Sequence, residues 1–220
     1  MKQITRSYHL LCPISRALDH VGDRWTLLIL RDLHAGPARF KDLQTGLTGI
    51  ASNLLSHRLH ALENSGIIRK IEGEFGVSLY SLTELGERTR ELIFELARFG
   101  SRMPRPEKIR KPGNLRTIAV SLGTAAKRAA TNKHEFVAKL LIDGEAFEMT
   151  AKDGQAGIRA GAPENPDVVM TTSYEPIMAL ADGEIEQSRF VSDHVALQVL
   201  TPGKQVAFLD LLTRSIREFD

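Results

Sequence analysis

The sequence contains only one cysteine, Cys12, among its 220 residues. A single thiol excludes a disulfide within the chain and any structural zinc site built on cysteines, and it is typical of a protein from a reducing compartment. No stretch reaches the 18 or more uninterrupted apolar residues of a membrane helix. The first twelve residues lack the apolar core and the small-residue cleavage site of a signal peptide. We therefore expect a soluble, cytoplasmic protein.

Proline and glycine, at 9 and 17 residues, are too few for a disordered or collagen-like chain. Hydrophobic residues make up 42% of the sequence and charged residues 25%, both near the average for globular proteins. At roughly 100–200 residues per domain, the length predicts one large domain or two small ones.

The formal net charge of +2 hides a strong asymmetry along the chain. Residues 1–103 carry 14 basic and 11 acidic side chains, residues 104–130 carry 7 and 1, and residues 131–220 carry 8 and 15. The basic middle segment also contains three prolines, which is typical of an exposed linker, so we place a linker between two domains there. Such asymmetry favours nucleic-acid binding, although a solvated basic tether would have the same composition.

The first domain begins with a series of short helical patterns. Apolar residues recur at helical spacing over residues 13–33, and Gly36 followed by Pro37 ends the second helix. A very short pattern follows at residues 40–47. We expect Ser52 to cap a longer fourth helix, Ser52–Asn64, which ends at the Ser-Gly pair that follows it. A short helix, a glycine-containing turn and a longer helix are the order of a helix-turn-helix.

A β-hairpin is predicted directly after the fourth helix. Residues 67–71 and 77–82 are β-rich, and the segment between them contains a glycine-rich tip, Gly73–Gly76. Thr83 is expected to cap a final helix over residues 84–102. A helix-turn-helix followed by a hairpin is a winged helix, which places its second helix in the major groove and its wing against the phosphate backbone or minor groove.

The polar side chains of the fourth helix are predicted to face outward, because its leucines form the core face. Asparagine can bind adenine, arginine can bind guanine, and serine or a helix N-terminus can bind a phosphate. The alternative is an ordinary solvated helix face, but the position between a turn and a hairpin favours DNA recognition. The predicted DNA-binding residues, two of them on the first strand of the hairpin, are Ser52, Asn53, Ser56, His57, Arg58, His60, Arg69 and Lys70.

Residues Cys12 to Phe99 resemble the HxlR-type winged-helix transcriptional regulators, which are related to the MarR group. The resemblance rests on CPISRALDHVGDRWTLLILRDLHAGPARFKDLQTGL, GIASNLLSHRLHALENSGIIRK and YSLTELG. It implies a homodimer that binds an operator in double-stranded DNA and regulates transcription, with Ser52–Asn64 as the reader helix and Gly73–Gly76 as the wing tip. It also implies a dimer interface around residues 14–21 and 85–99.

The wing departs from what phosphate binding requires. Glu72 and Glu74 stand where a phosphate contact would need lysine or arginine. Backbone contacts from this hairpin are therefore expected to come from Arg69 and Lys70.

Cys12 is the second feature that the resemblance singles out. Several relatives use the matching cysteine as a redox or electrophile sensor, and a thiol that precedes a helix can have its pKa lowered by the helix dipole. The alternative is a small buried hydrophobic residue. A disulfide switch would have to join two subunits, because the chain has no second cysteine.

Residues 131–220 predict a sheet covered by helices, so that the whole chain is α+β. Strand patterns alternate and are separated by tight turns, and we expect an antiparallel sheet. The expected strands are 136–142, 147–151, 156–160, 168–172 and 194–200, and the expected helices are 174–181 and 204–219.

This second domain resembles the sterol-carrier-protein-like fold over about residues 133–218. The resemblance is one of pattern and rests on NPDVVMTTSYEPIMALADGE and VALQVLTPGKQVAFLDLL. It implies an apolar tunnel and a fatty or sterol-like ligand. Apolar residues at these spacings would also form a plain core, and methionines suit either role. The predicted ligand-binding residues are Phe147, Met149, Met170, Ile177, Met178 and Phe190.

No catalytic or metal-binding constellation is recognisable. His57 and His60 lie three residues apart without an acidic partner at metal-ligand spacing, and Ser192, Asp193 and His194 are adjacent and so point in different directions. We predict a DNA-binding regulator that is not an enzyme and has no cofactor and no metal. The alternative is a lipid-binding or carrier protein that uses the winged helix as a protein-interaction module.

Overall fold

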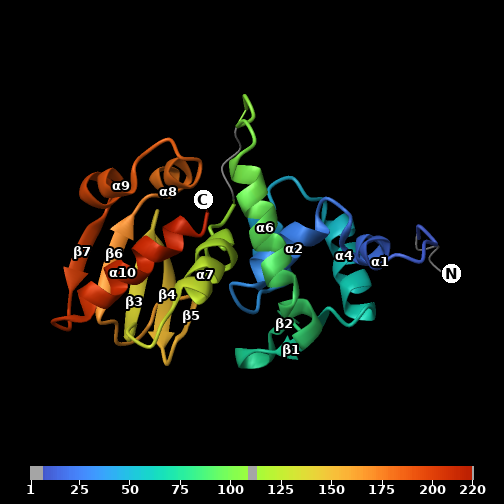
Figure 1. Ribbon diagram of the computed structural model, residues 1–220. Helices are drawn as coiled ribbons and strands as arrows, with labels where there is room; N and C mark the ends of the chain where they lie inside the picture. Colours follow the sequence, from blue (N-terminus) through green and yellow to red (C-terminus); the bar gives the residue numbers. More distant parts are fainter. Residues whose placement is uncertain (1–6, 109–112, 220) are drawn as a thin grey trace.

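The computed structural model describes residues 7–108 and 113–219. The N-terminal half is mostly helical and carries a two-stranded hairpin, while the C-terminal half contains a five-stranded sheet covered by helices (Figure 1). The α+β class that the sequence predicts is confirmed.

The helix-turn-helix elements lie where the periodicity of apolar residues predicts them. The leucines at positions 55, 59 and 62 are buried and anchor the fourth helix in the N-terminal core. The first four helices are α1 Pro13–Val21, α2 Thr26–Leu33, α3 Phe40–Gly46 and α4 Ser52–Asn64.

The prediction that Ser52 caps α4 is wrong by one residue. Ala51 occupies the N-cap position with an extended backbone, and Ser52 is already helical. The Ser52 hydroxyl instead accepts a hydrogen bond from the side-chain amide of Gln44 on α3. The two helices of the helix-turn-helix are therefore joined by side chains at their closest ends.

The predicted hairpin is present. Strands β1 Ile68–Glu72 and β2 Ser78–Leu82 pair in antiparallel fashion, and a single 3-10 turn, η1 Glu74–Gly76, closes the tip. The backbone N–H of Gly73 donates to the Val77 carbonyl at 2.8 Å and closes the base of that turn.

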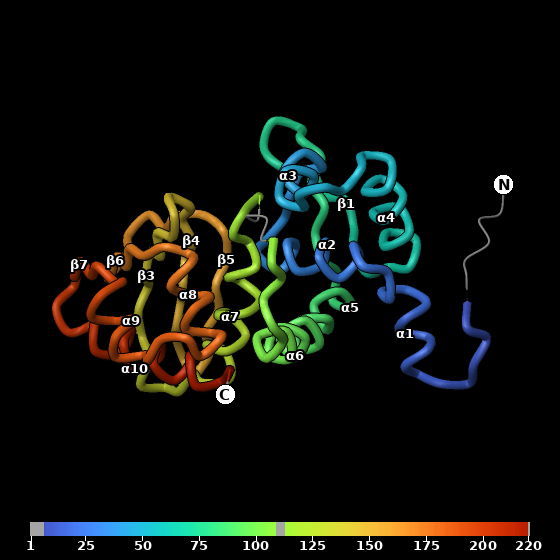
Figure 2. Tube along the Cα trace, turned by 90° about the horizontal axis from the view of Figure 1, so that it is seen from above, coloured from blue at the N-terminus to red at the C-terminus, as the bar shows by residue number. Residues whose placement is uncertain are grey.

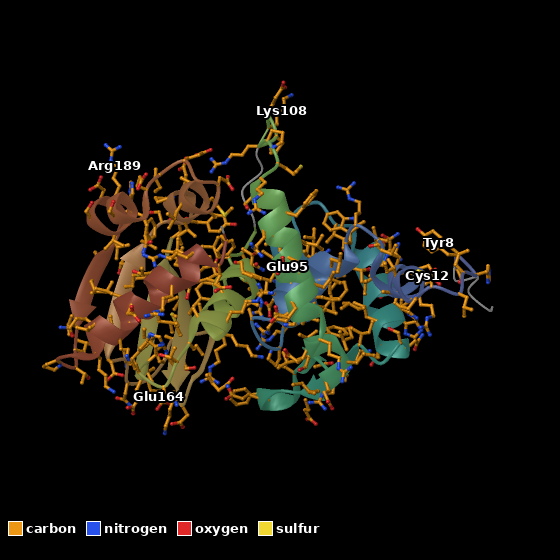
Figure 3. All side chains as sticks on the ribbon, viewed as in Figure 1. Tyr8, Cys12, Glu95, Lys108, Glu164 and Arg189 are labelled. Atoms are coloured by element: carbon orange, nitrogen blue, oxygen red, sulfur yellow. The ribbon has the colours of Figure 1, made fainter. Side chains whose placement is uncertain are left out.

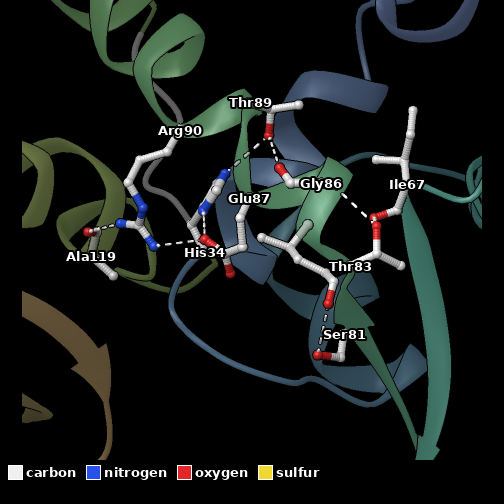
Figure 4. Close-up of polar contacts among 10 residues, drawn as sticks. His34, Ile67, Ser81, Thr83, Gly86, Glu87, Thr89, Arg90 and Ala119 are labelled. Atoms are coloured by element: carbon white, nitrogen blue, oxygen red, sulfur yellow. Dashed lines mark hydrogen bonds and ion pairs between the residues drawn. The ribbon is translucent and has the colours of Figure 1, made fainter.

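The final helix of this half is broken in two, as α5 Glu84–Glu87 and α6 Thr89–Ser101, where the sequence predicts one continuous helix. Thr83 caps α5 as predicted, because its hydroxyl accepts a hydrogen bond from the Gly86 N–H at 3.2 Å. The Thr89 hydroxyl donates to the Gly86 carbonyl at 2.7 Å and accepts a bond from the buried His34 ring at 3.0 Å (Figure 4). This side-chain bond to the helix backbone accompanies the break.

Residues 117–129 form helix α7, Thr117–Ala129, so the exposed linker predicted for residues 104–130 is wrong for this stretch. Eight of its thirteen residues are buried. Ile118 and Leu122 belong to the core of the C-terminal half, whereas Val120 belongs to the core of the N-terminal half. The linker composition was misleading because the basic residues of this helix gather in its last turn, outside both cores.

Hydrogen bonds also join the turn between α2 and α3 to the C-terminal half. The Ala160 N–H donates to the Ala35 carbonyl at 2.8 Å. The Arg116 guanidinium, just before α7, donates to the carbonyls of Asp32, at 2.8 Å, and Gly36. The two halves therefore share a helix and a set of buried polar contacts.

The sheet of the C-terminal half has the strand order β5-β4-β3-β6-β7. The predicted antiparallel arrangement is wrong at one pair, because β3 and β6 run parallel. After β5 the chain crosses to the far side of β3 before it adds the next strand, so the sheet is mixed. The strands are β3 Phe136–Ile142, β4 Glu145–Lys152, β5 Gln155–Ala160, β6 Val168–Thr172 and β7 Ala196–Val199.

Helices α7 and α10, Lys204–Arg217, lie across one face of this sheet (Figure 1). Helix α8 spans Tyr174–Ala181, as predicted. Helix α9, Gln187–His194, was not expected, and it shortens the predicted last strand because His194 ends the helix. The sequence of α9 is mostly polar, and Phe190 is its one buried residue, so it carries little apolar periodicity.

Candidate nucleic-acid interface

Helix α4 presents a polar face to the outside of the N-terminal half. Its buried leucines anchor the opposite face in the N-terminal core, so most of its polar side chains point away from that core. Figure 2 shows α3, α4 and the hairpin tip along one edge of this half, with α5 and α6 along the opposite edge and α1 beside the end of α4. The exposed residues that the structure brings together on α4 are Ser52, Asn53, Ser56, His57 and His60.

Arg58 differs from the other predicted contacts because it is half-buried. Its guanidinium forms an ion pair with Asp23. The second carboxylate oxygen of Asp23 accepts hydrogen bonds from the backbone N–H groups of Trp25, at 2.7 Å, and Thr26, at 3.0 Å. The expectation that Arg58 faces freely outward is therefore wrong: this side chain ties α4 to the start of α2.

The two basic residues predicted on the hairpin also differ from each other. Lys70 lies 3.5 Å from the Glu63 carboxylate and 5.6 Å from the centre of the Tyr80 ring, so it packs back onto the domain. Arg69 is exposed and forms no ion pair with any described residue. Arg69 is the better placed of the two for a phosphate.

The hairpin tip carries an exposed aromatic side chain that was not among the predicted site residues. Phe75 is 99% exposed and has a left-handed backbone with φ of 56°. Its neighbours Glu72 and Glu74 are exposed as well. The signal in the sequence was an aromatic residue inside the glycine-rich EGEFG segment, where a hairpin needs none.

Cys12 occupies the N-cap position of α1 and is half-exposed (Figure 3). The backbone N–H groups of Ser15 and Ile14, at the start of this helix, lower the pKa of the Cys12 thiol from its usual value. Cys12 is therefore not the small buried hydrophobic residue that was the alternative.

Exposed apolar side chains gather on α6 and on α1. Leu92, Leu96 and Phe99 follow one another at helical spacing on α6 and are exposed. Ile14 and Leu18 are exposed on α1. Exposed apolar patches on soluble domains usually mark an interaction surface.

The predicted ligand residues of the C-terminal half are brought together only in part. Phe147, Met149 and Met170 are buried in one core cluster, and Ile177 packs against it. Met178 is half-buried, while Phe190 is buried outside that cluster. A pocket of about 390 Å³ between the strand ends and α8 has a mostly polar lining and includes none of the six.

The part of the chain that the structure describes contains neither a candidate metal site nor a candidate membrane-spanning helix. Within residues 7–108 and 113–219, no three His, Cys, Asp or Glu side chains gather where they could hold a metal ion. None of the helices in these ranges has the length and apolar character needed to cross a membrane.

A model of the HxlR-like helix-turn-helix family matches residues 20–108. The HTH-type transcriptional regulator YtfH of Escherichia coli is 39% identical over 88 residues, which are 39% of this chain and 70% of the relative. The chain belongs to the HxlR-like helix-turn-helix family.

Two further proteins match over a similar share of this chain. The HTH-type transcriptional regulator sll1512 of Synechocystis is 33% identical over 93 residues, which are 41% of this chain and 69% of the relative. The solved structure of the reduced transcriptional regulator YodB from B. subtilis is 27% identical, covers 45% of this chain and all of that chain, and has a TM-score of 0.38. Both curated relatives are named as transcriptional regulators and not as enzymes, in agreement with the predicted absence of catalysis.

Proposed function

We propose that this protein is a dimeric transcriptional regulator that inserts α4 into the major groove of a specific operator. The observation that carries the proposal is the exposed polar face of α4, which lies on the same edge as the hairpin in a chain of the HxlR-like family. Short side chains such as Asn53 and Ser56 can reach base edges, and a bidentate asparagine contact discriminates between bases. Arg69 supplies a phosphate contact from the hairpin.

The dimer would form through the apolar surface of α1 and α6. Burial of these side chains against a second copy removes exposed apolar area from water, which is the main driving force for association. Because α6 lies on the edge opposite α4, pairing through α6 leaves both reader helices free. A two-fold dimer then binds half-sites about 34–36 Å apart.

The C-terminal half would sense a small apolar ligand, as the resemblance to the sterol-carrier-protein-like fold implies. Support comes from α8, whose sequence YEPIMALA is strongly apolar although none of its residues is buried. Its apolar side chains are half-buried, and Tyr174 and Ile177 pack against the C-terminal core. The part of this surface that stays accessible is where a fatty or sterol-like molecule would bind.

Selection of duplexes from a random pool by the full-length protein tests the DNA-binding proposal. We expect an enriched pseudo-palindromic sequence whose affinity falls steeply with salt, by about 0.9 log units per log unit of salt for each phosphate contacted. Asn53→Ala should abolish this specificity, since the side chain is exposed and its removal leaves the core intact. Gln198→Ala, on the exposed edge strand β7, is the matched control. Failure to enrich any sequence would refute the proposal.

A further inference from the structure

The tip of the hairpin presents an aromatic ring that the fold does not use. Phe75 is 99% exposed, and neither of the two hydrophobic cores includes it. No aromatic ring or cation of the described residues contacts its ring. Burial therefore does not explain why a phenylalanine occupies this position.

The backbone does not explain it either. Phe75 has φ of 56° and ψ of 30°, a left-handed conformation that glycine and asparagine adopt readily and a bulky side chain adopts at a cost. The turn around it is well defined, because the Gly73 N–H donates to the Val77 carbonyl at 2.8 Å and a Cβ on Gly73 would lie 2.7 Å from the Leu79 side chain. A strained and solvated aromatic residue is thus held at a fixed point in front of the hairpin.

The acidic side chains next to the ring limit the chemical groups that the hairpin tip can bind. Glu72 and Glu74 flank the ring and are repelled by DNA phosphates, so any attraction between the tip and DNA must come from the ring. An aromatic side chain instead interacts with the π-face of a base, and apolar wedges such as phenylalanine enter the minor groove and unstack a base step. The hairpin tip lies along the same edge as α4, so a reader helix in the major groove brings the tip toward the neighbouring groove.

We propose that Phe75 is a wedge that inserts between base pairs in the minor groove next to each half-site and bends the operator. This inference rests on the DNA-binding function proposed above. The wedge reads the deformability of the step and not its hydrogen-bonding groups, so flexible pyrimidine-purine steps should be preferred at that position.

The test compares full-length wild type with Phe75→Asn and Phe75→Trp on the duplex that wild type enriches from a random pool. Asparagine removes the ring and tolerates the left-handed backbone, so a binding defect cannot be caused by a distorted hairpin. We expect about tenfold weaker binding for Phe75→Asn, the size of one base-aromatic stacking contact. The bend, measured by energy transfer between end labels, should decrease in the same variant. Phe75→Trp should retain both.

The controls separate the wedge from other roles. Val206→Ala removes an exposed apolar side chain from α10 and should leave affinity and bend unchanged. Unchanged affinity and bend in Phe75→Asn would overturn the wedge while leaving the DNA-binding function intact. Dissociation of the Phe75→Asn dimer in sedimentation experiments would also overturn it, because the ring would then serve a protein contact. If wild type enriches no duplex at all, the proposed function itself fails.

Discussion

Two side chains of the N-terminal half are held away from their ordinary pKa by opposite environments. Cys12 lies at the open end of a helix, where backbone N–H groups stabilise the thiolate. His34 lies in the core, where burial lowers the pKa of its imidazole and disfavours the charged ring. The surroundings therefore favour the charged form of the Cys12 thiol and the neutral form of the His34 ring.

The lowered thiol pKa predicts fast alkylation of Cys12 at neutral pH. The thiolate is the nucleophile, so the rate of reaction with iodoacetamide should rise with pH through a midpoint below that of a free cysteine. The same protein unfolded in urea should show the ordinary midpoint, because the backbone contacts of α1 are lost. Equal midpoints in the two states would show that the helix end does not activate this thiol.

The lowered pKa of the buried His34 ring predicts that the protein loses stability in mild acid. Its folded pKa lies below the unfolded value, so the unfolded chain takes up the proton first as pH falls past about 6.5. The free energy of unfolding should therefore decrease below that pH and level off only below the folded pKa. Glu87 of α5, 3.5 Å from Nδ1, favours the charged ring, while Arg90 of α6 opposes it (Figure 4).

The variant that checks this is His34→Gln, which is neutral at all of these pH values and can still donate to Thr89. Urea unfolding at pH 5 and 7.5 should show a smaller difference for His34→Gln than for wild type. A difference of the same size in both proteins would assign the acid sensitivity to other groups.

The elements with one buried face could be predicted from the sequence, and those defined by contacts between distant residues could not. The leucine stripe of α4 and the alternating strand β3 repeat with a regular period, so local sequence determines which face is buried. Helix α7 consists largely of small residues that are buried on most sides, and its role depends on two cores that meet only in the folded chain. The partner of Arg58 is 35 positions away, which no local pattern indicates.

Arg58 predicts a stability effect that the other α4 residues do not share. Arg58→Ala removes the partner of the Asp23 carboxylate and loosens the start of α2, so we expect a loss of about 1–2 kcal/mol in unfolding free energy. Ser56→Ala, on the exposed face of the same helix, should change stability by less than about 0.5 kcal/mol. Urea denaturation of both variants measures the difference. Equal stabilities would mean that the ion pair contributes nothing to the fold.

At the scale of the whole molecule, the charge asymmetry of the sequence gives the two halves net charges of opposite sign. The half that carries α4 is weakly basic, and residues 131–220 carry 15 acidic against 8 basic side chains. DNA would attract the first and repel the second, which keeps the C-terminal half off the duplex. A signal from that half must then travel through the protein, and the contacts that could transmit it are α7 and the bonds of Arg116 and Ala160 to the end of α2 and the turn between α2 and α3.

Because α7 contributes side chains to both cores, we predict that a cavity in the C-terminal core destabilises the N-terminal half as well. Trp25 is the only tryptophan and packs against the N-terminal core, so its fluorescence reports unfolding of that half alone. Leu122→Ala creates its cavity on the side of α7 that faces the C-terminal core, and Val120 on the same helix belongs to the other core. If α7 couples the halves, the Trp25 transition should lose about 2–5 kcal/mol and coincide with the transition seen by circular dichroism. Leu200→Ala, at an exposed leucine, should change neither. A Trp25 transition that stays at the wild-type denaturant concentration would show that the halves unfold independently, and α7 could then not carry a signal between ligand and DNA.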